Sequence, residues 1–153
     1  MLHFAYGSNM SRTLMHRRCP TAVPLGAARL EGWRFIVTHD GYASVVPAPG
    51  AVVHGVLWRL AARDCAALNA YESLDSGLYR RRVLPVAHDA RQVSALVFVG
   101  RERRAGRPRP GYQELVVQAA REWQMPDDYV RALQRWSPAR GVGVRRVETG
   151  EIA

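Results

Sequence analysis

The most informative segment of the chain is Leu2-His3-Phe4-Ala5-Tyr6-Gly7-Ser8-Asn9, close to the first residue. Its first five residues are apolar and aromatic, which predicts a short buried strand that ends at Gly7. Gly7 allows the backbone to turn, while Ser8, Asn9 and Ser11 carry oxygens that can cap a helix beginning at residue 12. Such a loop can direct backbone N–H groups at a carboxylate or an oxyanion. A capped turn without a ligand is the alternative interpretation.

A second segment makes this signal specific. It is Tyr71-Glu72-Ser73-Leu74-Asp75-Ser76-Gly77-Leu78-Tyr79-Arg80-Arg81. Together with the first loop (residues 6–9), the order of Glu72, Gly77 and Tyr79 resembles the gamma-glutamylcyclotransferase family. Further matching features follow in the same order, namely Cys19-Pro20-Thr21-Ala22 with Gly26, the stretch from Gly55 to Leu60, and the late pattern from Tyr112 to Leu133. The resemblance therefore covers nearly the whole chain.

The resemblance implies an enzyme that converts a gamma-glutamyl amide or dipeptide to 5-oxoproline and a free amine. The residue that matches the family's general acid and base is Glu72, and the residues that match its substrate-binding positions are Tyr6, Gly7, Ser8, Asn9 and Tyr79. The family needs no metal and no organic cofactor. One departure is Ser73, because the family often has a glycine directly after the acid, and this difference affects the path of the loop around Glu72.

The residues around Glu72 agree with such a role. A helix ending near Tyr71 would put Glu72 on the same face as Leu68, where burial raises the pKa of a carboxyl and suits it to accept and return a proton. A solvated acid at a helix end is the alternative. Tyr79 has two interpretations as well, since its hydroxyl can bond the base or the substrate, or its ring can simply pack at the start of a strand.

Length and composition indicate one domain over residues 1–153, with residues 140–153 as a tail of uncertain packing. All 22 basic residues are arginine and the net charge is +9, a bias that codon supply explains better than a nucleic-acid partner does. Cys19 and Cys65 stand apart, and the five histidines lack ligand spacing, so we expect no metal site. No leader or membrane span is apparent, which predicts a soluble cytoplasmic protein without a membrane partner.

The order of elements predicts an α+β fold, a mixed or antiparallel sheet curled into a small barrel and flanked by helices. We expect strands at residues 2–6, 28–30, 34–38, 43–46, 52–60, 80–88 and 93–99, with breaks at Gly32, at Asp40-Gly41 and from Pro47 to Gly50. Helices are expected at residues 12–17, 64–71 and 112–123, and another is expected to open at Pro126. The oligomeric state is not readable from these patterns.

Other functions remain open at this point. The same chemistry could remove a gamma-glutamyl protecting group from a specialised metabolite, or the fold could be a non-catalytic module that binds a small molecule. A nucleic-acid binder driven by net charge is a further alternative, although the clusters at residues 80–82 and 101–109 lack a reading element. The arginine-rich loop (residues 101–109) could close over a pocket and hold an anionic leaving group, or it could be a solvated loop.

Overall fold

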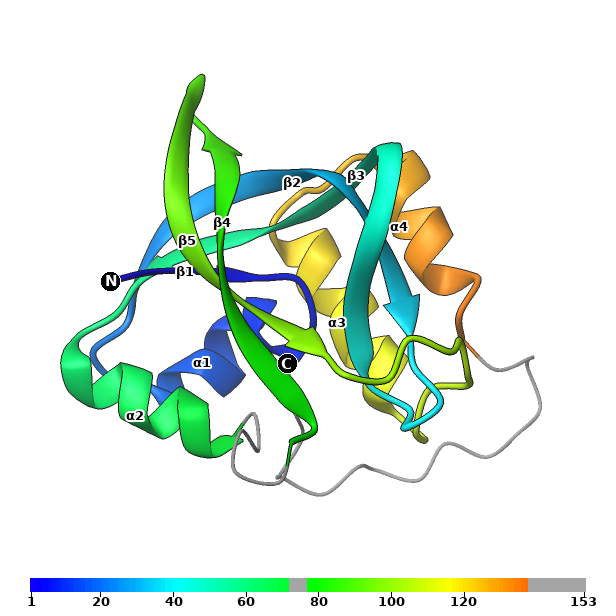
Figure 1. The fold of residues 1–153 in the computed structure, drawn as a ribbon, viewed down its shortest axis with the longest axis horizontal. Helices are drawn as coiled ribbons and strands as arrows, with labels where there is room; N and C mark the ends of the chain where they lie inside the picture. Colours follow the sequence, from blue (N-terminus) through cyan, green and yellow to red (C-terminus); the bar gives the residue numbers. More distant parts are fainter. Residues whose placement is uncertain (72–76, 138–153) are drawn as a thin grey trace.

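The computed structural model describes residues 1–71 and 77–137 of the chain. In these two ranges five strands form a closed barrel in the order β1-β3-β2-β4-β5 (Figure 1). The strands are β1 (Leu2–Ala5), β2 (Val23–Val37), β3 (Ala43–Arg59), β4 (Tyr79–His88) and β5 (Arg91–Gly100). The helices are η1 (Ser8–Met10), α1 (Arg12–Arg18), α2 (Ala62–Tyr71), α3 (Tyr112–Glu122) and α4 (Asp127–Gln134). The predicted α+β barrel flanked by helices is confirmed.

The barrel closes through a parallel pairing. β1 lies antiparallel to β3 and parallel to β5, where His3 pairs with Leu96, while the other neighbours in the barrel are antiparallel. Parallel strands end on the same side, so the segments that follow β1 and β5 leave the barrel at one end. The helices form two pairs outside the barrel, with α1 packed against α2 and α3 against α4 (Figure 1).

Two predicted strand breaks are wrong. β2 runs through Gly32 and β3 runs through Pro47 to Gly50, and the two strands stay paired over most of their length. Gly32 has a φ of +81°, and the register shifts there, because Glu31 pairs with Val52 and Trp33 pairs with Pro47. Residues 48–51 of β3 therefore lie opposite Gly32 alone, and this irregularity interrupts the pairing without ending either strand. The turn at Asp40-Gly41 is confirmed, with the Gly41 N–H donating to the Thr38 carbonyl.

The helices lie where the sequence predicts them, within two residues at each end. α1 begins after Ser11, whose side chain accepts a hydrogen bond from the backbone N–H of Leu14 at 3.3 Å. α4 begins after Pro126, which is its N-cap residue. α3 buries Tyr112, Val116 and Ala119, which lie at i, i+4 and i+7 on one face of the helix, at 1% exposure or less.

His3 is a buried polar residue in this core. Its side chain is 2% exposed, its Nδ1 lies 3.0 Å from the Leu96 carbonyl oxygen, and its ring meets Phe98 edge to face. Because a carbonyl oxygen only accepts, Nδ1 must carry the hydrogen in this contact. Desolvation lowers the pKa of His3 to about 4, against the partial opposing effect of the bond to Leu96.

We predict that His3 makes the protein sensitive to acid. From pH 6.5 down to about 4, the unfolded chain takes up a proton at this position and the folded chain does not, so this residue lowers the free energy of unfolding by up to about 3 kcal/mol. Urea denaturation at pH 7, 6, 5 and 4 measures this effect. The difference in stability between wild type and His3→Gln is expected to narrow as pH falls, and a constant difference would contradict the prediction. The exposed His39, changed to Gln, is the control.

Candidate functional site

The first loop is buried and tightly turned. Ser8 and Asn9 are at most 1% exposed, and they begin the single turn η1 directly after β1. Backbone bonds fix the turn, with the Met10 N–H donating to the Gly7 carbonyl at 3.1 Å and the Ser11 N–H donating to the Ser8 carbonyl at 3.0 Å. The polar side chains of this loop therefore face the interior of the protein, where a ligand would be shielded from water.

Arg18 forms hydrogen bonds with two side chains of the first loop. This residue is 6% exposed, and its Nη1 donates to Ser8 Oγ at 3.0 Å and to Asn9 Oδ1 at 2.5 Å. Its guanidinium carbon lies 4.9 Å from the centre of the Tyr71 ring, at the last residue of α2. One buried arginine thus joins the first loop, α1 and the end of α2.

The sequence reasoning did not single out Arg18. In a chain with 22 arginines and no lysine, one more arginine at the end of a short helix is typical of a solvated surface. The available signal was its spacing, because Arg18 lies three residues after the buried Met15 and therefore shares a helix face with it.

Tyr6 and Tyr79 are both 2% exposed and both bond to the backbone of neighbouring strands. The Tyr6 hydroxyl donates to the Phe98 carbonyl oxygen near the end of β5. The Tyr79 hydroxyl donates to the Ala43 carbonyl oxygen at 2.6 Å, and Tyr79 pairs across the sheet with Gly100. Because Phe98 and Gly100 are two residues apart on β5, both tyrosines belong to the same end of the barrel.

A small, narrow cavity lies beside Tyr79, and it is too tight to hold a water molecule. Its lining consists of Thr38, Asp40, Tyr42, Leu78, Tyr79, Gly100 and Glu102. Sites for whole small-molecule ligands are usually about 300–1,000 Å³, so this cavity is not by itself a ligand site.

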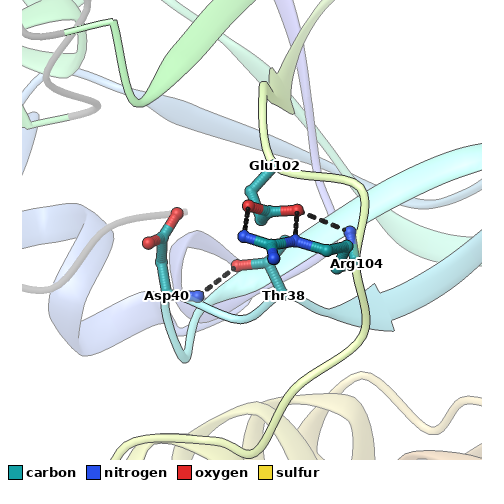
Figure 2. Close-up of polar contacts among 4 residues, drawn as sticks. All are labelled: Thr38, Asp40, Glu102 and Arg104. Carbon is teal, nitrogen blue, oxygen red and sulfur yellow. Dashed lines mark hydrogen bonds and ion pairs between the residues drawn. The ribbon is translucent and has the colours of Figure 1, made fainter.

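The Glu102 carboxylate at this cavity is paired with an arginine. Figure 2 shows the Arg104 side chain paired with both oxygens of Glu102, through its Nε at 3.0 Å and its Nη2 at 2.9 Å. Hydrogen bonds from Arg104 lower the pKa of Glu102 to about 2, so this carboxylate stays ionised near neutral pH. The Asp40 carboxylate lies apart from this pair, while the Asp40 N–H bonds to Thr38 Oγ1 at 3.2 Å.

The arginine-rich loop is tied to the turn between β2 and β3. The Arg104 carbonyl accepts from the His39 N–H, and the Gly106 N–H donates to the Val37 carbonyl, each at 2.9 Å. A Cβ on Gly106 would come within 2.6 Å of the Thr38 carbonyl oxygen, so only glycine fits this approach. The loop therefore packs against this turn, and two of its arginines have partners that line the cavity. Arg104 pairs with Glu102, and Arg109 contacts Asp40 and Tyr42.

Five of the six predicted site residues have a described position: Tyr6, Gly7, Ser8, Asn9 and Tyr79. Glu72, the predicted base, and its neighbour Ser73 lie outside the described residues. The assignment of these residues to one catalytic site therefore remains a prediction. In the described ranges no helix has both the length and the apolar character needed to cross a membrane.

Comparison with solved structures places the barrel in a known class. A structure named gamma-glutamyl cyclotransferase superposes with a TM-score of 0.87 at 24% identity, covering 97% of this chain and 94% of its own. An uncharacterized human protein superposes with a TM-score of 0.86 at 25% identity, covering 97% of this chain and 93% of its own. The fold is thus that of gamma-glutamyl cyclotransferases.

Sequence comparison extends this from fold to family. Residues 3–125 match the family model described as gamma-glutamyl cyclotransferase, AIG2-like, and the chain belongs to this family. The gamma-glutamylcyclotransferases of mouse and human are 27% and 26% identical to it in alignments 148 residues long, which cover 90% of this chain and 79% of theirs. The predicted family is confirmed, and with it the general character of a cyclotransferase enzyme.

We predict that the Tyr79 hydroxyl stabilises the fold at this end of the barrel. Changing Tyr79 to Phe removes the donor to the buried Ala43 carbonyl and is expected to lower the free energy of unfolding by about 1–2 kcal/mol. Tyr42→Phe is the matched control, because the Tyr42 ring lines the same cavity and the described residues give its hydroxyl no hydrogen bond. Equal stability of the two variants in urea denaturation would contradict this role.

Proposed function

We propose that the chain converts a gamma-glutamyl amide or dipeptide to 5-oxoproline and a free amine, with Glu72 as general base and general acid. The observation that carries the proposal is the position of Arg18, which bonds to Ser8 and Asn9 and lies over the Tyr71 ring. Glu72 follows Tyr71 directly in the chain. This contact between the end of α2 and the first loop supports a base close to the proposed binding site.

The proposed reaction is internal to the substrate. The α-amine nitrogen attacks the γ-carbonyl carbon and closes a five-membered ring, and the bond from that carbon to the leaving nitrogen breaks. Glu72 takes the proton that the amine loses and returns it to the leaving nitrogen, so the carboxyl ends in its starting state. The protein has two further tasks, which are to hold the flexible glutamyl chain in a reactive shape and to stabilise charge on the carbonyl oxygen.

The polarity of the described residues supports this use. Tyr6 and Tyr79 give their hydroxyl hydrogens to backbone carbonyls, so their oxygens would act towards a substrate as acceptors, which suits the α-amine. Residues 7–9 would bind an anionic part, either the α-carboxylate or the carbonyl oxygen that becomes charged. A gamma-glutamyl unit carries an amine and a carboxylate on one carbon, and it therefore matches both kinds of group.

The proposed partner is this small molecule and not a nucleic acid. The described arginines near the proposed site have partners within the protein. Arg104 pairs with Glu102, and Arg109 donates to the Asp40 carbonyl at 3.1 Å and lies over the Tyr42 ring. Two of the arginines that produce the net charge of +9 therefore make contacts within the protein.

We predict that Glu72→Gln reduces kcat by at least about 100-fold with little change in KM, because the amide can neither take up nor return the proton. The assay measures 5-oxoproline released from a panel of gamma-glutamyl amino acids and gamma-glutamyl amines. Glu114→Gln, at an exposed position in the first turn of α3, is the control and is expected to match wild type.

Two results would contradict the proposal in different ways. Turnover by Glu72→Gln at the wild-type rate would remove Glu72 from the mechanism. Saturable binding of gamma-glutamyl compounds by wild type, with no 5-oxoproline from any of them, would indicate the non-catalytic binding module instead. The panel also separates a general activity from the removal of a protecting group, since the latter requires one preferred amine.

A further inference from the structure

A groove lies between α3 and α4, the helix pair on the outside of the barrel (Figure 1). Its volume of about 410 Å³ is in the usual range of about 300–1,000 Å³ for small-molecule sites. The floor is apolar and formed by Met125 and Val130, which are at most 7% exposed. Neither residues 6–9 nor Tyr79 line this α3–α4 groove, so it is separate from the described residues of the proposed catalytic site.

The walls of the α3–α4 groove are polar and basic. Arg121 and Gln124 come from the end of α3 and the turn after it, and α4 contributes Asp127, Arg131 and Gln134. The three residues of α4 lie at i, i+4 and i+7 and therefore share one face of the helix. Two guanidiniums and one carboxylate give the groove a net charge of +1. Among the described residues, the side chains of Arg121 and Arg131 form neither an ion pair nor a hydrogen bond.

The convergence of the two arginines needs a physical reason. Arg121 and Arg131 each stand in the last turn of their helix, where the helix dipole favours a cation. The dipole does not explain why both line one groove, because like charges in a shared site repel each other. A bound anion between the two guanidiniums would replace this repulsion with attraction.

Gln124 is a second unusual feature of the α3–α4 groove. Its φ of +53° is left-handed, and it directly follows Trp123, the C-cap residue of α3. The turn closes the helix, with the Gln124 N–H donating to the Arg121 carbonyl at 2.9 Å and the Met125 N–H donating to the Ala120 carbonyl at 3.1 Å. Glycine is the residue that favours this position, since it has no Cβ. The turn alone therefore does not account for a glutamine whose side chain lines the groove.

We propose that the α3–α4 groove binds an acidic amino acid such as glutamate, at a site additional to the proposed catalytic site. Glutamate has two carboxylates and one ammonium group, and the groove has two guanidiniums and one carboxylate, so the charges match one for one. The Asp127 carboxylate accepts from the ammonium group, and the amides of Gln124 and Gln134 add neutral hydrogen bonds. The apolar floor contacts the methylene groups of the ligand.

The first test measures binding of L-glutamate to the full chain by calorimetry, and by the NMR signals of the side-chain amides of Gln124 and Gln134. Saturable shifts of both amides are expected. Arg121→Gln and Arg131→Gln are each expected to weaken binding by at least about 10-fold, because a charge-assisted hydrogen bond is lost. Arg135→Gln is the matched control. It removes the same charge from an exposed position at the end of α4 that does not line the groove, and wild-type affinity is expected.

The second test uses glutarate, which has both carboxylates and no amine. Wild type is expected to bind glutamate about 10-fold more tightly than glutarate, because only glutamate has a charged donor for Asp127. Asp127→Asn is expected to abolish this preference. Asp128→Asn is the control and is expected to keep it, since the Asp128 carboxylate accepts from the Tyr129 N–H and does not line the groove.

Gln124→Gly separates ligand binding from a role in the fold. Glycine relieves the left-handed backbone, so the free energy of unfolding is expected to stay the same or rise. The affinity for glutamate is nevertheless expected to fall by about 3- to 10-fold, because a hydrogen bond to the ligand is lost. A purely structural role for Gln124 predicts unchanged affinity.

The opposing results are equally specific. The inference would be overturned if glutamate at millimolar concentration shifted neither amide, or if Arg121→Gln and Arg131→Gln bound it as tightly as Arg135→Gln does. Glutamate that binds only at the catalytic site would compete with a gamma-glutamyl substrate and leave both amides unshifted, which also contradicts the inference. None of these measurements requires turnover. A wild type that forms no 5-oxoproline would contradict the proposed function and leave the test of the groove intact.

Discussion

The parallel contact between His3 and Leu96 is the constraint on which the arrangement of the site depends. Without it β1 would belong only to β3, and the barrel would be an open sheet. With it, β1 and β5 end on the same side, so the first loop and the arginine-rich loop leave the barrel at one end. Tyr6 shows the result directly, since its hydroxyl reaches the Phe98 carbonyl on β5. The position of the site follows from strand direction before any side chain is considered.

Arg18 adds a second level of order at that end. A buried arginine is unfavourable unless hydrogen bonds and packing compensate for lost solvation. Here the compensation comes from Ser8, Asn9 and the Tyr71 ring, which belong to separate parts of the chain. The buried guanidinium needs hydrogen-bond acceptors, and Ser8 and Asn9 supply them. These bonds stabilise one conformation of the first loop.

The sequence predicts the barrel and its helices well because those elements have clear periodicity and clear caps, as at Ser11. The prediction fails at Gly32 and Pro47, since in a long paired hairpin the partner strand supplies enough hydrogen bonds to carry a bulge or a proline. Arg18 was missed for a different reason. Its role depends on Tyr71, more than fifty residues away, and no local pattern of residue types carries that information. The loop motif could be found, while the residue that orients it could not.

The polarity of the site shows why such orientation matters for the proposed chemistry. When a substrate reacts with its own amine, the protein gains little from supplying a reactive group and much from fixing the substrate's shape. Arg18 contributes to this at the first loop, because a guanidinium only donates and therefore holds the Ser8 hydroxyl oxygen and the Asn9 carbonyl oxygen as its acceptors. The arginine thereby fixes the conformation of the loop in which the proposed substrate-binding residues lie.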